Sequence, residues 1–190
     1  MEEDLLEVVR SVSVRLTRMG MTLALAESCT GGYIANAITD LAGASGFFTL
    51  GVVSYSAGAK ESVLGIPGAD LERFGTVSAE TASAMARGVR QLSGAAIGLS
   101  TTGVAGPDTV EGKDKGLVYI AVAYEGRLET KTLRLSGDRQ EIKRASSLEA
   151  LRLLRGVLDS LTEFGPDSLP DSGPNAGPHE GPHEGFDSCD

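Results

Sequence analysis

Histidine is missing from most of this 190-residue sequence, because its two histidines, His179 and His183, both lie close to the C-terminus. Residues 1–162 also contain no tryptophan and a single cysteine, Cys29. A Ser-His-Asp triad, a Cys-His dyad and a zinc site that uses histidine are therefore excluded from that part of the chain. Any acid–base chemistry there must come from Lys, Asp, Glu, Tyr, Cys or the backbone.

Cysteines and long apolar stretches are scarce as well. The two cysteines, Cys29 and Cys189, are too few for a disulfide scaffold. The longest apolar stretch covers residues 117–124, far short of the roughly 20 residues that cross a bilayer. The first residues are Met-Glu-Glu-Asp, without the cationic start of a signal peptide. We therefore expect a soluble cytoplasmic protein that does not bind membranes.

Acidic residues outnumber basic ones by 26 to 17, which gives a formal net charge of −9. Nucleic acids are polyanions, so direct nucleic-acid binding is not expected. Near the C-terminus Gly-Pro-His-Glu occurs twice in tandem, in a segment rich in glycine, proline and acidic residues that cannot bury a core. We predict a folded domain over residues 1–162 and a disordered acidic tail over residues 163–190, whose histidines are solvated and hold no metal.

Helical and strand patterns alternate along the folded part. Apolar residues recur at helical spacing in segments 3–19, 30–41, 78–92 and 138–161, and a short helix is predicted at 57–64. Strand-like runs occupy residues 21–26, 47–55, 95–100, 117–124 and 128–135. The last two flank a Glu125-Gly126 turn, which predicts an antiparallel hairpin. The pattern predicts a single α/β domain with layered helices around a mixed β-sheet.

The segment Ala-Glu-Ser-Cys-Thr-Gly-Gly, residues 26–32, follows a predicted buried strand and opens a predicted helix. Its hydroxyls and glycines would leave backbone N–H groups free at the positive end of a helix dipole. Such a place holds an anion or stabilises developing negative charge. Plain N-capping of the helix by Ser28 or Thr30 accounts for the same residues and stays open as the alternative.

Three further segments carry polar residues that could meet a ligand. Lys60 follows the strand predicted at residues 47–55, although most lysines at such places are simply exposed. The glycines of residues 102–106 permit close backbone approach to a ligand, and the polar stretch after them is typical of a mobile lid or a surface turn. Arg139 lies in the first turn of the last helix, where the dipole disfavours a cation, so it is expected to serve a ligand anion.

Together these segments resemble the C-terminal domain of the competence/damage-inducible protein CinA, the nicotinamide-nucleotide amidase (PncC) family. The resemblance covers about residues 5–160. Its motifs are Glu-Ser-Cys-Thr-Gly-Gly at 27–32, Tyr55 with Lys60, Val-Ser-Ala-Glu-Thr-Ala at 77–82, Thr-Gly-Val-Ala-Gly-Pro at 102–107 and Gly-Asp-Arg at 137–139. It implies hydrolysis of the carboxamide of nicotinamide mononucleotide to nicotinate mononucleotide and ammonia, without a cofactor.

The resemblance also implies residue roles. By motif position, Ser28 is the nucleophile, Lys60 is its partner and Tyr55 lies beside the lysine. We expect Lys60 to be the general base, its pKa lowered by burial or by a cation such as Arg139, with Tyr55 relaying or orienting the proton. A charged Lys60 that only stabilises the oxyanion is the alternative. The residues expected to bind substrate are Thr30, Gly31, Gly32, Thr102, Gly103, Gly106 and Arg139.

The family further implies a homodimer, and an additional N-terminal domain in some members that this chain is not expected to carry. The sequence departs from the family pattern near Lys60, where Ala57 and Gly58 replace the usual Asn and Glu, and after Gly106, where Asp114-Lys115 replaces Lys-Pro. These departures leave open a nucleotide-binding family member with altered catalysis. A third possibility is an interaction protein linked to competence or DNA repair, with the acidic tail contacting a protein partner.

Overall fold

A five-stranded mixed sheet forms the centre of the computed structural model, which describes residues 2–163. Its strand order is β2-β1-β3-β4-β5. The strands are β1 (Leu23–Glu27), β2 (Phe48–Val53), β3 (Ile97–Gly103), β4 (Leu117–Tyr124) and β5 (Arg127–Arg134). Strand β1 pairs in parallel with β2 and β3, whereas β4 pairs antiparallel with β3 and β5. The predicted mixed sheet and its hairpin are therefore confirmed.

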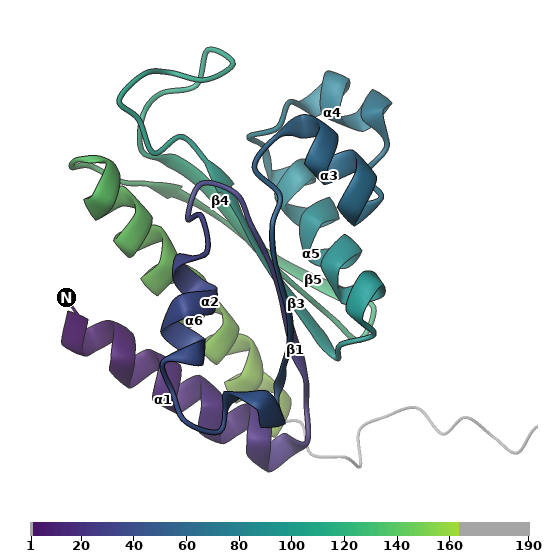
Figure 1. The fold of residues 1–190 in the computed structure, drawn as a ribbon, viewed down its shortest axis with the longest axis vertical. Coiled ribbons are helices and arrows are strands. Elements are labelled where there is room, and N and C mark those ends of the chain that lie inside the picture. The colour runs from purple at the N-terminus through teal and green to yellow at the C-terminus, as the bar shows by residue number, and fades with distance from the viewer. Residues whose placement is uncertain (1, 164–190) are drawn as a thin grey trace, which may run out of the picture.

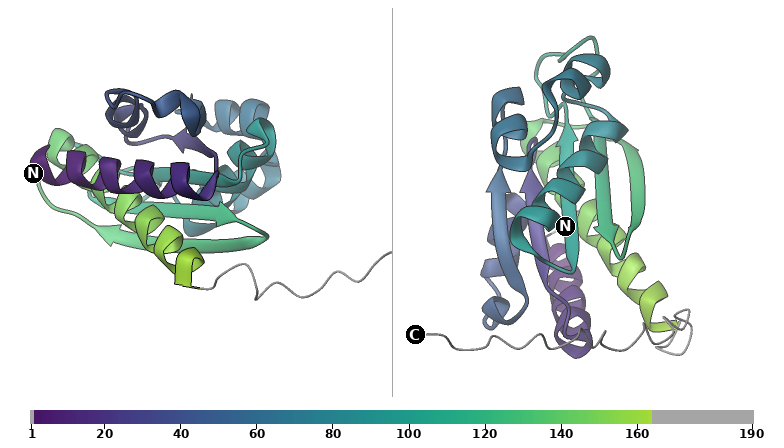
Figure 2. Two further views of the ribbon diagram at one scale, coloured as in Figure 1. Left: turned by 90° about the horizontal axis from the view of Figure 1, so that it is seen from below. Right: turned by 90° about the vertical axis from the view of Figure 1, so that its right-hand side faces the viewer.

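Helices cover both faces of the sheet (Figure 1). One group consists of α1 (Glu2–Met19), α2 (Tyr33–Thr39) and α6 (Arg139–Glu163), and the other of α3 (Ala57–Leu64), α4 (Gly68–Phe74) and α5 (Ala79–Ser93). Helix α5 packs on β1, β3 and β4, while α6 packs on β3 and β4 from the opposite face and contacts α1 and α2. Figure 2 shows the same layers from two other sides. No helix in residues 2–163 is long and apolar enough to cross a membrane.

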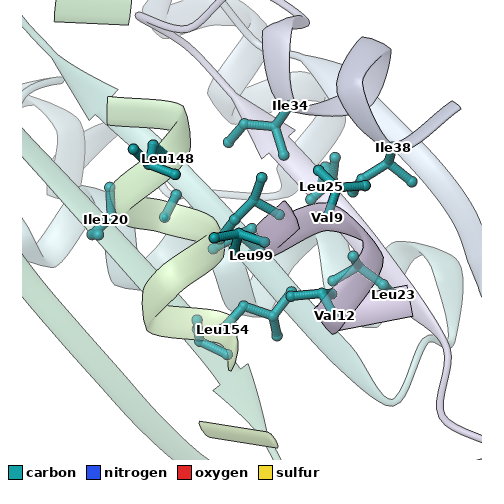
Figure 3. Close-up of a cluster of buried hydrophobic side chains, with 14 of the residues drawn as sticks. Val9, Val12, Leu23, Leu25, Ile34, Ile38, Leu99, Ile120, Leu148 and Leu154 are labelled. Atoms are coloured by element: carbon teal, nitrogen blue, oxygen red, sulfur yellow. The ribbon is translucent and has the colours of Figure 1, made fainter. Parts of the chain in front are cut away.

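Side chains that point alternately to the two faces of the sheet divide the hydrophobic core between the two helix layers. Successive side chains of a strand point to opposite faces, so Leu23 and Leu25 of β1 meet α1 and α2, whereas Ala24 and Ala26 meet α5. The larger cluster is drawn in Figure 3, where the labelled side chains are Val9, Val12, Leu23, Leu25, Ile34, Ile38, Leu99, Ile120, Leu148 and Leu154. The small alanines on the other side of β1 let α5 lie close to the sheet.

Helices α2 and α4 differ from the sequence-based expectation. Helix α2 begins at Tyr33 rather than at residue 30, because Gly31 and Gly32 adopt left-handed φ angles of 63° and 90° that end the preceding turn. Helix α4 was not predicted at all; it is short and follows Pro67. Of the predicted tail, only Glu163 falls within the described residues, as the last residue of α6; the rest lies outside them.

The site is positioned by the parallel part of the sheet. The carboxyl ends of β1, β2 and β3 lie at one edge, as parallel pairing requires. Hydrogen bonds continue just past that edge: the Ser28 N–H donates to the Thr101 carbonyl at 3.0 Å, and the Ser54 N–H donates to the Glu27 carbonyl at 2.9 Å. The segments that leave β1 and β2 are thereby held side by side.

Candidate active site

Lys60 meets Ser28 inside the protein. The Ser56 hydroxyl caps the start of α3, and one turn later Lys60 points back toward the strand ends. Its side chain is only 1% exposed, and its Nζ lies 3.0 Å from Ser28 Oγ and 2.8 Å from the Ser54 carbonyl oxygen. A third oxygen, the Tyr55 carbonyl, lies at 3.5 Å. The alternative of an ordinary exposed helical lysine is therefore wrong.

Burial sets the pKa of Lys60. It lowers the pKa from its usual value, because a charged ammonium loses its hydration inside the protein. The charges of a Cys29 thiolate and of the Glu111 carboxylate would oppose part of this lowering. Only Glu111 does so near neutral pH, because burial raises the pKa of the Cys29 thiol to about 12 and keeps it uncharged. The shift thus comes from burial and not from the guanidinium of Arg139.

A cavity of about 250 Å³ opens beside Ser28. Its lining comes from five parts of the chain: Ser28 and Cys29 after β1, Tyr55 after β2, Thr76 and Val77 before α5, residues 102–108 with Val110 after β3, and Arg139 at the start of α6. Ser28 therefore faces open space on one side and Lys60 on the other. Among the described residues, no three His, Cys, Asp or Glu side chains gather closely enough to hold a metal ion.

Arg139 connects two walls of this cavity. One of its Nη atoms donates to the Gly106 carbonyl, and the other donates to the Tyr55 hydroxyl at 2.8 Å. Asp138 caps α6 by accepting from the N–H groups of Gln140 and Glu141, which fixes the first turn of the helix. The expectation that the Tyr55 hydroxyl relays or orients a proton at Lys60 is wrong for this structure. It is the Tyr55 backbone, through its carbonyl, that faces the lysine.

The start of α2 is not a free anion site, contrary to the expectation for residues 26–32. The buried carboxylate of Glu27 accepts from the N–H groups of Gly32, Ile34 and Ala35 at 2.9, 3.2 and 2.8 Å. Capping by Ser28 or Thr30 is equally wrong, because a carboxylate occupies these donors. The Thr30 hydroxyl instead pairs with that of Thr101 at 2.7 Å. Thr30, Gly31 and Gly32 are absent from the cavity lining described above.

The predicted glycines of the loop after β3 do line the cavity, but packing at Gly103 and a left-handed φ of 83° at Gly106 explain why they are glycines. A Cβ at Gly103 would lie 2.6 Å from Val118 Cγ2, and one at Gly106 would lie 2.5 Å from the Lys115 side chain. The Thr102 hydroxyl lies at the cavity but donates to the Thr76 carbonyl at 2.6 Å, so it offers a ligand only its lone pairs.

Sequence reasoning missed three contributors. The Ser54 carbonyl holds Lys60, and no side-chain motif could reveal a backbone contact. Lys143 lies one turn after Arg139 on α6, and its Nζ lies close to Gly31. Residues four apart lie on the same face of a helix, so the sequence could have indicated that Lys143 accompanies Arg139. Glu111 joins the loop after β3 to Thr76. The Glu111-Gly112 sequence could have indicated a turn at this place.

Comparison with known proteins identifies the family of the chain. A family model, the CinA C-terminal domain, matches residues 6–158. The chain belongs to this family. A competence-damage inducible protein of Thermoanaerobacter pseudethanolicus is 49% identical over 159 residues, covering 83% of this chain and 38% of the relative. A CinA-like protein of Geobacter sulfurreducens is 48% identical over 137 residues, covering 72% and 33% respectively.

Solved CinA structures share the fold. A CinA superfamily protein of Klebsiella pneumoniae superposes with a TM-score of 0.80 at 32% identity, covering 82% of this chain and 98% of that one. The competence/damage inducible protein CihA of Agrobacterium tumefaciens gives a TM-score of 0.78 at 36% identity, covering 82% and 96%. The chain thus covers nearly the full length of these solved CinA proteins, although it spans only about a third of the curated relatives' length.

Proposed function

We propose that this CinA-family chain is an amidase that hydrolyses the carboxamide of nicotinamide mononucleotide, with Ser28 as nucleophile and Lys60 as its base. One observation carries the proposal: the buried Lys60 Nζ lies 3.0 Å from Ser28 Oγ, and Ser28 lines the cavity. A serine is a weak nucleophile until a neighbouring base accepts its proton, and a Ser-Lys pair needs no imidazole. This agrees with the absence of histidine from residues 1–162.

The three oxygens around Lys60 Nζ could accept from the three N–H groups of an ammonium, and they also fit a neutral amine that accepts from Ser28. The carbonyls of Ser54 and Tyr55 can only accept, so each requires an N–H from Nζ. A neutral amine has two such hydrogens and one lone pair. The lone pair is left for Ser28, whose hydroxyl is the one neighbour among these three that can donate. Burial favours the same neutral form.

The reaction then follows in two halves. Ser28 Oγ attacks the carboxamide carbon while Lys60 Nζ takes the hydroxyl proton, which gives a tetrahedral intermediate. The resulting ammonium returns that proton to the leaving nitrogen, so ammonia departs and an ester to Ser28 remains. A water molecule, deprotonated by the same Lys60, hydrolyses the ester, releases nicotinate mononucleotide and restores the Ser28 hydroxyl.

Cys29 is the rival nucleophile, since it also lines the cavity. Burial raises its pKa to about 12, and the thiolate is the reactive form of cysteine. At neutral pH nearly all of the thiol is therefore protonated. Cys29 fits the role of a small apolar side chain packed in the larger core cluster.

Arg139 supports a mononucleotide as substrate. It is the one cation that lines the cavity within the described residues, and a guanidinium suits a dianionic phosphate. Lys143, with its ammonium beside Gly31, is a second cation, near the segment that follows Ser28. In this arrangement the carboxamide would lie at Ser28 and the phosphate toward α6. A homodimer and a protein partner for the acidic tail stay predictions.

Ammonia release from nicotinamide mononucleotide tests the proposal. The wild-type chain should release ammonia, Ser28→Ala should lose more than about a thousandfold in kcat, and Cys29→Ala should stay within about fivefold. The two substitutions affect adjacent buried residues, so each controls for disturbance of the loop by the other. The proposal fails if the wild type releases no ammonia, or if Cys29→Ala is the dead variant.

A further inference from the structure

The loop between β3 and β4 contains a tight hairpin turn. Val110 and Lys113 exchange backbone hydrogen bonds of 3.2 and 2.9 Å, with Glu111 and Gly112 at the tip. Both tip residues have left-handed φ angles, 53° and 70°. Glycine adopts this conformation freely, but a glutamate in it is uncommon and is maintained by its surroundings.

The Glu111 carboxylate accepts from four donors. Thr76 contributes its N–H at 2.9 Å and its hydroxyl at 2.6 Å, Val77 its N–H at 3.4 Å, and Lys113 its ammonium at 2.9 Å. The bonds to Thr76 and Val77 join segments that lie 35 and 34 residues apart. Gly75 leaves room for the carboxylate, because a Cβ there would collide with it.

Both segments joined by Glu111 are walls of the cavity beside Ser28. Thr76 and Val77 belong to one lining segment, and Asp108 and Val110 belong to the loop after β3 that also lines the cavity. The bond from the Thr102 hydroxyl to the Thr76 carbonyl fixes the first wall to β3. Glu111 therefore joins two segments of the chain that both line the cavity.

We propose that Glu111 is a positioning residue, a latch that holds the loop of residues 107–115 against Thr76 and Val77 and so shapes the pocket that confines the substrate. Its effect on turnover rests on the amidase function proposed above; its effect on the loop does not. The latch also brings a negative charge toward Lys60.

A surface ion pair is the simpler interpretation of Glu111, and the contacts argue against it. The pair with Lys113 joins residues of one turn and cannot hold the loop to anything else. The two backbone N–H groups of Thr76 and Val77 have the Glu111 carboxylate as acceptor. Without it, the turn would keep its own backbone bonds but lose its anchor on Thr76 and Val77.

Hydrogen exchange on the full chain tests the latch itself. Glu111→Ala should raise the exchange rate of the Thr76 amide at least tenfold, because its acceptor is removed. Glu125→Ala is the matched control: Glu125-Gly126 is also a Glu-Gly turn with φ angles of 45° and 75°, at the β4–β5 hairpin. This control variant should leave Thr76 exchange unchanged. Glu111→Gln, which keeps the side-chain size, covers the case in which the alanine variant folds poorly.

Kinetics with nicotinamide mononucleotide test the role in the site. Glu111→Ala should raise KM about tenfold and change kcat less than threefold, because the latch shapes the pocket and not the reacting atoms. Glu111→Gln should also shift the acidic limb of the kcat/KM profile to lower pH, because removal of a negative charge makes Lys60 easier to deprotonate. A purely structural role would not move this limb.

Each result decides the proposal. Faster Thr76 exchange together with a higher KM and a shifted acidic limb supports it. Unchanged exchange in both Glu111 variants overturns it, as does faster exchange with KM and the acidic limb unaltered. If the wild type releases no ammonia, the amidase function fails while the exchange of Thr76 alone still decides for or against the latch.

Discussion

The Ser54 carbonyl oxygen lies 2.8 Å from Lys60 Nζ and holds the lysine against Ser28. Ser54 is itself fixed, since its N–H donates to the Glu27 carbonyl. The lysine that follows β2 is therefore tied to the serine that follows β1 through the backbone of the sheet edge, and not through a flexible side-chain network.

The first expectation concerns the protonation of Lys60. Burial lowers its folded-state pKa, so the neutral form grows as pH rises through that lowered value, and kcat/KM should rise with it. Lys60→Arg should lose more than about a thousandfold, because a guanidinium does not deprotonate. Measuring kcat/KM against pH for both proteins checks this. Substantial activity in the arginine variant would instead indicate a charged residue that stabilises the oxyanion.

The second expectation concerns the substrate phosphate. Nicotinamide riboside lacks the phosphate, so it should have a kcat/KM at least a hundredfold below that of the mononucleotide. Arg139→Ala should weaken turnover of the mononucleotide by a similar factor and leave the riboside nearly unaffected, because the lost interaction is with the phosphate. Measuring kcat/KM for both substrates with the wild type and with Arg139→Ala gives the interaction energy between Arg139 and the phosphate. Equal losses on the two substrates would argue for a purely structural Arg139.

The third expectation separates Tyr55 from the chemistry. Its hydroxyl is bonded to Arg139, and only its carbonyl faces Lys60. Tyr55→Phe should therefore leave the pH dependence of kcat unaltered and raise KM by about two- to fivefold, since Arg139 loses one of its two anchors. A shift in the pH profile of kcat would instead place the phenol in the proton path.

The fourth expectation concerns stability. Glu27 is 2% exposed, and its carboxylate accepts three backbone N–H groups at the start of α2. Glu27→Ala should lower the free energy of unfolding by about 2–4 kcal/mol, since buried donors are left unsatisfied. Glu72→Ala, at an exposed position of α4, should change it by less than about 0.5 kcal/mol. Urea denaturation measures both; a small loss at Glu27 would contradict the capping role.

Local pattern was enough to predict much of this protein. The apolar periodicity indicated the strands and most of the helices, and Glu125-Gly126 indicated the hairpin, because these signals depend on neighbours a few residues apart. The motifs around Ser28 and Lys60 were sufficient to indicate the family, and strand ends brought the candidate residues to one sheet edge. Lys60 and Ser28 were expected to act together from the resemblance, not from their spacing of 32 residues.

Only the tertiary structure decided which groups are free to act. Packing buries Lys60 and thereby lowers its pKa. It also places the Glu27 carboxylate on the backbone N–H groups at the start of α2, and the Tyr55 hydroxyl against Arg139. Glu111 reaches Thr76 across 35 residues, which no local pattern encodes. A sequence shows which donors and acceptors a segment carries, but their partners depend on contacts between distant segments, and these exist only after the chain has folded.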